Sequence, residues 1–107
     1  MIELAVENWE VEVTNADSLV LVDWWGEACT DCIALLPLVE ELEKTYGEKI
    51  KFCKFNTSQK GVRRFCIKHK ILGLPVISIY KSGEKLAEIS KEECTKDGID
   101  ALINKYL

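Results

Sequence analysis

Residues 29–32 read Cys-Thr-Asp-Cys, and the sulfur atoms of Cys29 and Cys32 are the groups of this chain best suited to covalent chemistry. Two cysteines three positions apart at the start of a helix lie on one face of its first turn, so their sulfurs can close a small ring. The free N–H groups and the positive end of the helix dipole stabilise a thiolate there. We predict a redox dithiol in which Cys29, just outside the helix, is the exposed nucleophile. Cys32, one turn in and partly buried, is then the resolving thiol.

A metal site is the main alternative to a redox dithiol. Cys66 and His69 add a Cys-x2-His pair to the Cys-x2-Cys pair, and together they make an acceptable ligand set for zinc. Against zinc, Cys66 and His69 fall on a predicted helix whose apolar stripe turns the cysteine toward the core. A complete helix and strand also separate the two pairs, where zinc modules usually have a short loop. We therefore expect no metal, and a zinc-binding domain and a non-catalytic binding subunit remain the alternative functions.

Length, charge and cysteine count restrict the class of protein. With 107 residues, 48% of them apolar, the chain fits one domain over residues 1–107 with a modest core. A net charge of -4 argues against nucleic acid as a partner, and no apolar run approaches the roughly 20 residues of a membrane span. The start, MIELAVENWE, lacks the features of a signal peptide, so we expect a cytoplasmic protein, and we expect a monomer. Five cysteines, an odd number, favour a catalytic or metal-binding pair over a disulfide framework.

The apolar pattern predicts the elements that position the dithiol. Residues 19–25 (LVLVDWW) form a nearly continuous apolar run, typical of a strand buried on both faces of a parallel sheet. Residues 8–14 fit either a half-buried strand or a short helix capped by Asn8. The other predicted strands are 2–5, 49–56, 76–80 and 85–89, and the predicted helices are 32–46, 58–70 capped by Ser58, and 95–106 capped by Thr95.

This order of elements indicates an α/β fold with a central mixed β-sheet flanked by helices on both faces. Its core is parallel, and a late hairpin turning at Ser82 and Gly83 adds an antiparallel edge. Of the remaining cysteines, Cys53 lies inside a central strand and Cys66 lies on a core stripe, so both are expected to be small buried apolar groups. Cys94 lies near a helix start, where exposure would permit a regulatory or dimer-forming role.

The chain resembles the thioredoxin family over nearly its whole length. The matching stretches are VDWWGEACTDC at 22–32, Pro37 in the following helix, KFCKFN at 51–56, GLP at 73–75 and KSGE at 81–84. The resemblance implies the thioredoxin fold and a thiol–disulfide oxidoreductase that reduces protein disulfides. It also implies that the Cys29–Cys32 disulfide is the redox centre, with no bound cofactor. A flavoprotein thioredoxin reductase would reduce it again.

The resemblance also assigns roles to residues around the dithiol. Asp23 matches the buried carboxylate that takes the proton from the second cysteine, and its apolar strand should raise its pKa. Lys54 matches the lysine that packs near this carboxylate and moderates the shift. Trp25 matches the tryptophan beside the dithiol.

A second group of matches concerns the binding of substrate. Pro75 matches the cis proline that faces the disulfide, and the cis bond would turn the Leu74 backbone outward to pair with a substrate strand. Gly73 matches the glycine that flanks the substrate groove.

The active-site loop departs from the usual Trp-Cys-Gly-Pro-Cys-Lys of the family. Ala28 replaces the tryptophan, and Thr30 and Asp31 replace Gly-Pro. A carboxylate at Asp31 disfavours a nearby thiolate, which favours the disulfide form and predicts a strongly reducing protein. The WWGE, FCK and GLP blocks are similar to those of small thioredoxins that accompany glycine-reductase-type systems, whose recycling enzymes can be atypical flavoproteins.

Overall fold

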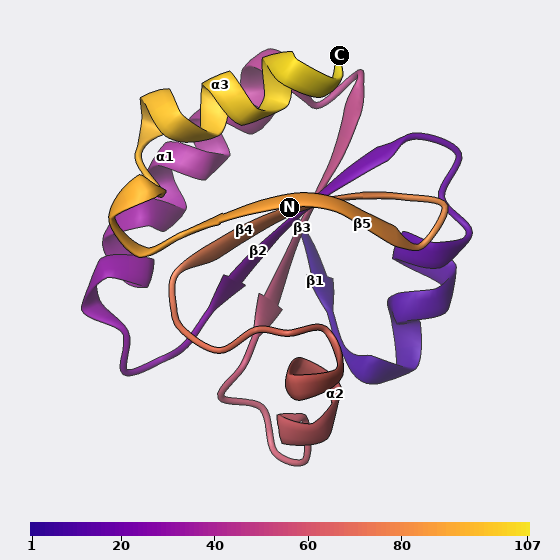
Figure 1. The fold of residues 1–107 in the computed structure, drawn as a ribbon, viewed down its shortest axis with the longest axis vertical. Helices are drawn as coiled ribbons and strands as arrows, with labels where there is room; N and C mark the ends of the chain where they lie inside the picture. The colour runs from indigo at the N-terminus through magenta and orange to yellow at the C-terminus, as the bar shows by residue number, and fades with distance from the viewer.

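Five strands form one mixed sheet in a computed structural model that describes residues 1–107. The strands are β1 (Ile2–Leu4), β2 (Leu19–Trp25), β3 (Ile50–Asn56), β4 (Val76–Lys81) and β5 (Glu84–Ser90). They lie in the order β1-β3-β2-β4-β5, and both β1 and β2 run parallel to β3 (Figure 1). β4 is antiparallel to β2, and β5 is antiparallel to β4. The predicted parallel core with an antiparallel hairpin at its edge is confirmed.

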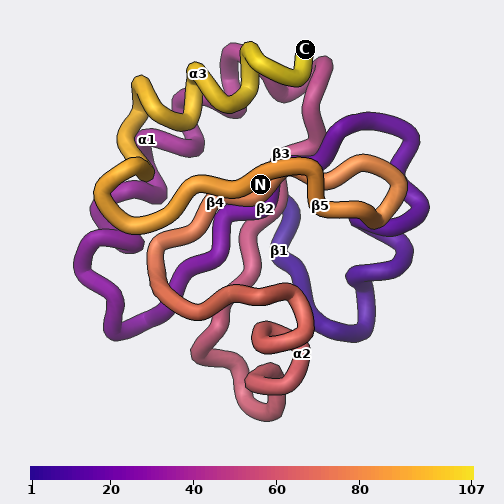
Figure 2. The backbone as a smooth tube through the Cα atoms, viewed as in Figure 1, coloured from indigo at the N-terminus to yellow at the C-terminus, as the bar shows by residue number.

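Helices cover both faces of this sheet, as the sequence predicts. The regular helices are α1 (Thr30–Tyr46), α2 (Arg63–Lys68) and α3 (Lys96–Tyr106). α1 and α3 lie together on one face, while α2 and the N-terminal helical segment lie on the other (Figures 1 and 2). Each face has its own apolar core: Leu35, Val39 and Ile99 belong to one cluster, and Trp9 and Val62 belong to the other. None of the helices is both long and apolar enough to cross a membrane.

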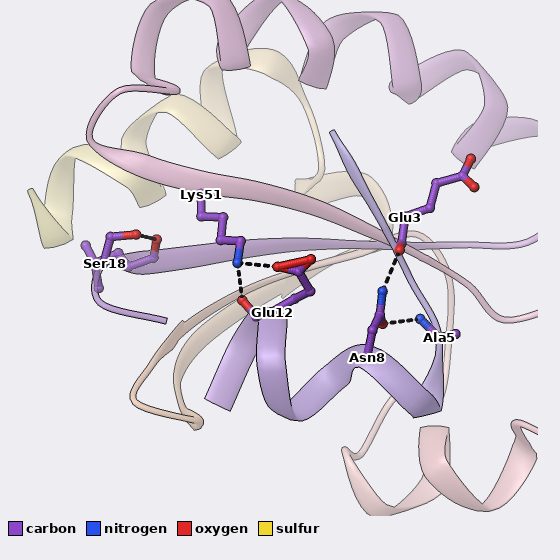
Figure 3. Close-up of polar contacts among 7 residues, drawn as sticks. Glu3, Ala5, Asn8, Glu12, Ser18 and Lys51 are labelled. Atoms are coloured by element: carbon purple, nitrogen blue, oxygen red, sulfur yellow. Dashed lines mark hydrogen bonds and ion pairs between the residues drawn. The ribbon is translucent and has the colours of Figure 1, made fainter. Parts of the chain in front are cut away.

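The segment that the sequence left open between strand and helix is helical. A 3-10 turn at Val6–Asn8 leads into a π-helical turn at Glu10–Thr14. Figure 3 shows the Asn8 side chain fixing the entry, since its Oδ1 accepts a hydrogen bond from the Ala5 N–H at 2.7 Å. Farther along, the Lys51 ammonium donates to the Glu12 carbonyl oxygen at 2.8 Å and to its Oε1 at 2.7 Å (Figure 3).

The ends of the remaining helices test the predicted caps. The Thr95 Oγ1 accepts a hydrogen bond from the Gly98 N–H at 3.0 Å, so the cap of α3 is confirmed. The prediction for Ser58 is wrong: its hydroxyl accepts a hydrogen bond from the Glu27 N–H at 2.9 Å, in the loop before the dithiol. Gly61 then adopts a left-handed conformation with φ 79°, and α2 begins only at Arg63. Ser58 therefore ties two loops together rather than starting a helix.

Candidate active site

The two cysteines of the dithiol lie at the N-terminus of α1 and form a disulfide. Cys29 is the N-cap residue, so the helix starts two residues before the predicted position, and its Sγ accepts a hydrogen bond from the Cys32 N–H at 3.2 Å. Cys29 is half-buried, whereas the Cys32 side chain is wholly buried. This asymmetry gives an incoming disulfide access to only one of the two sulfurs.

The Asp23 carboxylate lies in the centre of β2, on the strand that leads to the dithiol. It has no exposed surface, and neither of its carboxylate oxygens has a hydrogen-bond partner in the chain. Burial raises the pKa of Asp23 from its ordinary 3.8 to about 7, and the Lys54 ammonium opposes this rise. Lys54 is the direct neighbour of Asp23 in the register between β2 and β3. The site thus holds a carboxylate that can gain or lose a proton near neutral pH.

The loop before β4 brings Gly73, Leu74 and Pro75 together, and the Leu74–Pro75 peptide bond is cis. Neither the N–H nor the carbonyl of Leu74 makes a hydrogen bond within the chain, so this stretch of backbone is open to a partner. The Leu74 side chain packs on Gly26, where an added Cβ would lie 3.1 Å from Leu74 Cδ1. Gly26 therefore lets the cis-proline loop approach the loop that carries Cys29.

An open pocket of about 630 Å³ lies beside this loop and the start of α1. Asp31, Leu74 and Pro75 contribute to its lining, and so do Lys91 and Glu92 from the segment after β5. The predicted tuning residues Thr30 and Asp31 are both exposed in the first turn of α1. Sequence reasoning missed Gly26, Lys91 and Glu92, because only the three-dimensional return of β5 places the last two at the site.

Cys94 also lines this pocket, but its side chain is buried and 9% exposed. Its Sγ lies 3.6 Å from the Pro75 carbonyl oxygen and 3.5 Å from that of Ile89. Burial raises the pKa of the Cys94 thiol to about 12. The exposure considered from the sequence is therefore wrong, because Thr95 caps α3 and the residue before it turns inward against the cis-proline loop.

Trp25, the last residue of β2, is half-buried. Trp25 lines a cavity of about 170 Å³ together with Lys54, Asn56 and Gln59, among others. The indole Nε1 is buried without a hydrogen-bond partner in the chain. Contact between this ring and the dithiol stays a prediction.

The residues that could have formed a zinc site are separated. Cys66 is buried in the core cluster that also contains Trp9, and the His69 Nδ1 lies 3.2 Å from the Tyr80 hydroxyl. Cys29 and Cys32 are joined to each other, and no group of three or more His, Cys, Asp or Glu side chains is arranged to hold a metal ion. Cys53 is buried as predicted.

The arrangement can store two electrons as a pair of thiols and release them by closing the ring between Cys29 and Cys32. Its chemical class is therefore that of the thiol–disulfide oxidoreductases. The family model for thioredoxin matches residues 1–105. The chain belongs to the thioredoxin family, as the sequence motifs predict, and like other members it is a protein-disulfide reductase.

Similarity to individual proteins agrees with this assignment. The chain is 46% identical over 107 residues to a thioredoxin of Acetoanaerobium sticklandii, covering the whole of both chains. It is 44% identical over 107 residues to a thioredoxin of Peptoclostridium acidaminophilum, covering 100% of this chain and 96% of the relative. The crystal structure of Chlamydomonas reinhardtii thioredoxin f2 shares the fold with a TM-score of 0.87 at 23% identity, over 99% of this chain and 95% of that one.

Proposed function

We propose that this protein is a cytoplasmic, monomeric electron carrier that reduces protein disulfides and is itself re-reduced by a flavoprotein reductase. The observation that carries the proposal is the disulfide at the start of α1, with one sulfur accessible and the other buried. The three free cysteines, Cys53, Cys66 and Cys94, are all buried, which supports the proposal that the exchangeable electrons belong to the dithiol. The proposed carrier uses this dithiol in place of a bound cofactor.

The proposed reaction has two exchanges. In the first, the Cys29 thiolate attacks one sulfur of a client disulfide, forms a mixed disulfide and releases one client thiolate. In the second, the Cys32 thiolate attacks the Cys29 sulfur and releases the second client thiolate. The client gains two electrons, and with two protons it becomes a dithiol, while Cys29 and Cys32 are oxidised to the disulfide.

Asp23 is proposed to accept the proton that Cys32 must lose before the second exchange. A thiol buried as deeply as Cys32 cannot pass its proton directly to bulk water. The pKa of about 7 lets the carboxylate take a proton and release it again near neutral pH, and Lys54 keeps that pKa from rising further.

The client is proposed to bind as an extended segment along the cis-proline loop. The free N–H and carbonyl of Leu74 can pair with a client strand, as in the addition of a strand to a sheet edge. Gly73 lies next to this stretch of backbone, Pro75 begins the buried part of the loop, and Trp25 is proposed to border the same surface. Pairing through backbone groups suits a reductase with many clients, because it reads little of their sequence.

Insulin reduction tests the function as a whole. With dithiothreitol as the electron source, we expect the protein to accelerate precipitation of the insulin B chain many times over the reductant alone. The Cys29→Ser variant should give no acceleration. A wild-type protein that matches dithiothreitol alone would contradict the reductase function and favour a non-catalytic binding subunit.

The reductase partner needs a separate assay. The altered surface at Ala28 and Asp31 leads us to propose an atypical flavoprotein as the recycling enzyme, as the likeness to thioredoxins of glycine-reductase-type systems implies. We therefore expect slow reduction of the protein by a standard NADPH-dependent thioredoxin reductase, followed through NADPH absorbance. Rapid reduction by that enzyme would contradict the proposal.

Asp31 is proposed to make the dithiol more reducing. Its exposed carboxylate in the first turn of α1 repels a thiolate at the same helix end, and an interaction between exposed charges is worth up to about 1 kcal/mol. In Asp31→Asn we expect the equilibrium with glutathione to shift toward the dithiol by about fivefold. Asp17→Asn removes an exposed carboxylate before the opposite end of β2 and should leave this equilibrium unchanged. An unchanged or opposite equilibrium in Asp31→Asn would refute the tuning role.

A further inference from the structure

Lys91 follows β5 directly and adopts a backbone conformation that lysine rarely takes. Its φ is 52°, in the left-handed region. In this conformation the Lys91 N–H donates a hydrogen bond of 2.8 Å to the Pro75 carbonyl oxygen. A strained residue persists where its surroundings hold it, and such residues gather at binding sites. The conformation joins Lys91 to the cis-proline loop.

The Lys91 side chain lies over Gly73. A Cβ added at Gly73 would come within 2.8 Å of the Lys91 Cε and 3.6 Å of its Nζ. Any larger residue at position 73 would therefore displace the lysine. Gly73 does not adopt a positive φ, so its contribution here is the space that it leaves for the Lys91 side chain.

The Lys91 ammonium is free to bind a partner. It makes no hydrogen bond and no salt bridge, although Glu92 and Glu93 follow it directly in the sequence. Lys91 and Glu92 line the pocket between the cis-proline loop and the start of α1 together with Leu74, whose N–H and carbonyl are unpaired. A cation thus lies next to the backbone on which a client strand would pair.

We propose that Lys91 is a specificity-determining residue, whose ammonium binds a carboxylate on the client strand beside the cysteine under attack. The inference rests on the proposed pairing of that strand with Leu74. Backbone pairing alone treats most clients alike, whereas a cation beside it favours clients with Asp or Glu at one position and disfavours those with Lys or Arg.

A charge-exchange experiment tests the inference. The substrates are short cystine-containing peptides that carry Glu, Gln or Lys at each position next to the attacked cysteine, reduced with dithiothreitol as the electron source. The proteins are wild type, Lys91→Glu, and Lys91→Met, which keeps the aliphatic stem over Gly73 without the charge. Lys81→Glu is the matched control, because it makes the same charge change at the opposite end of β4.

At one peptide position, we expect the wild type to prefer Glu over Lys by roughly threefold to fivefold in kcat/KM. The preference should vanish in Lys91→Met, reverse in Lys91→Glu, weaken at 0.5 M salt and stay unchanged in Lys81→Glu. A Lys91→Glu protein that keeps the wild-type preference, or that changes kcat/KM equally for all peptides, would overturn the role of Lys91 but not the proposed function. A wild type that reduces none of the peptides would overturn the proposed function with it.

Discussion

Replacing Cys32 with Ser is expected to lower turnover with protein disulfides by at least roughly a thousandfold, while the first attack by Cys29 continues. The buried sulfur of Cys32 is the only one that the fold holds against Cys29, so without it the mixed disulfide has no internal route to resolution. Client proteins should then stay covalently attached to Cys29. Mass spectrometry of the trapped complexes measures this outcome and identifies the clients.

The matched variant for the trapping experiment is Cys29→Ser. It makes the same Cys-to-Ser change at the other position of the dithiol. It should trap no client, because Cys32 is fully buried and cannot attack a large substrate. Because Ser places a hydroxyl in a buried position, Cys32→Ala provides a second variant with an intact apolar surrounding. Recovery of no Cys29-linked protein from either Cys32 variant would contradict the assigned roles.

Replacing Asp23 with Asn should stabilise the protein in a way that depends on pH. The pKa of Asp23 is raised in the folded state, so the folded protein binds this proton more tightly than the unfolded chain does. The free energy of unfolding of the wild type is therefore not diminished by Asp23 below pH 4, and it decreases as the pH rises toward 7. Between the ordinary pKa of 3.8 and the folded value of about 7, the loss amounts to roughly 4 kcal/mol at 1.36 kcal/mol per pKa unit.

Urea unfolding of the oxidised proteins between pH 4 and pH 8.5 measures this effect. The free energy of unfolding of Asp23→Asn should be close to that of the wild type at pH 4 and exceed it by up to about 4 kcal/mol above pH 7. Asp17→Asn, at an exposed position, should show a small difference with no such trend. A stability difference that is constant across this pH range would mean that Asp23 does not titrate as the structure implies.

The same variant should slow resolution of the mixed disulfide. Above pH 7 the wild-type carboxylate is ionised and can accept the Cys32 proton, whereas Asn cannot, so we expect roughly a hundredfold slower release of the client in stopped-flow experiments. Below pH 6 the Asp23 carboxyl of the wild type is protonated and cannot accept the Cys32 proton either. The rates of client release by the wild type and by Asp23→Asn should then converge. The gain in stability and the slower release of the client in Asp23→Asn should thus both depend on the titration of Asp23.

The sequence predicted the site where its chemistry depends on residues close together or on adjacent strands. Cys29 and Cys32 share one helix start, and the patterns of β2 and β3 indicated the strands on which Asp23 and Lys54 are neighbours. These features could be predicted because periodicity and motifs can be read from a single sequence.

Other features depended on information that a linear pattern lacks. In residues 9–13 the apolar Trp9 and Val13 are four positions apart, a spacing that fits both an alternating strand and one helical turn. The structure selects the helix by burying both and leaving Val11 exposed. Cys94 and Lys91 contact Pro75 only because β5 pairs with β4. No pattern in the residues KEEC at 91–94 predicts that contact.

The burial of Cys53, Cys66 and Cys94 has a practical consequence for the oxidised protein. Once Cys29 and Cys32 are joined, the only free thiols belong to buried side chains, so linkage of two molecules by air oxidation and reshuffling of the native pairing are both disfavoured while the chain stays folded. On reduction, a single sulfur becomes accessible to reagents. The molecule therefore has one reactive thiol, which is available only in the reduced protein. A fluorophore or resin can be attached there without removing any native cysteine.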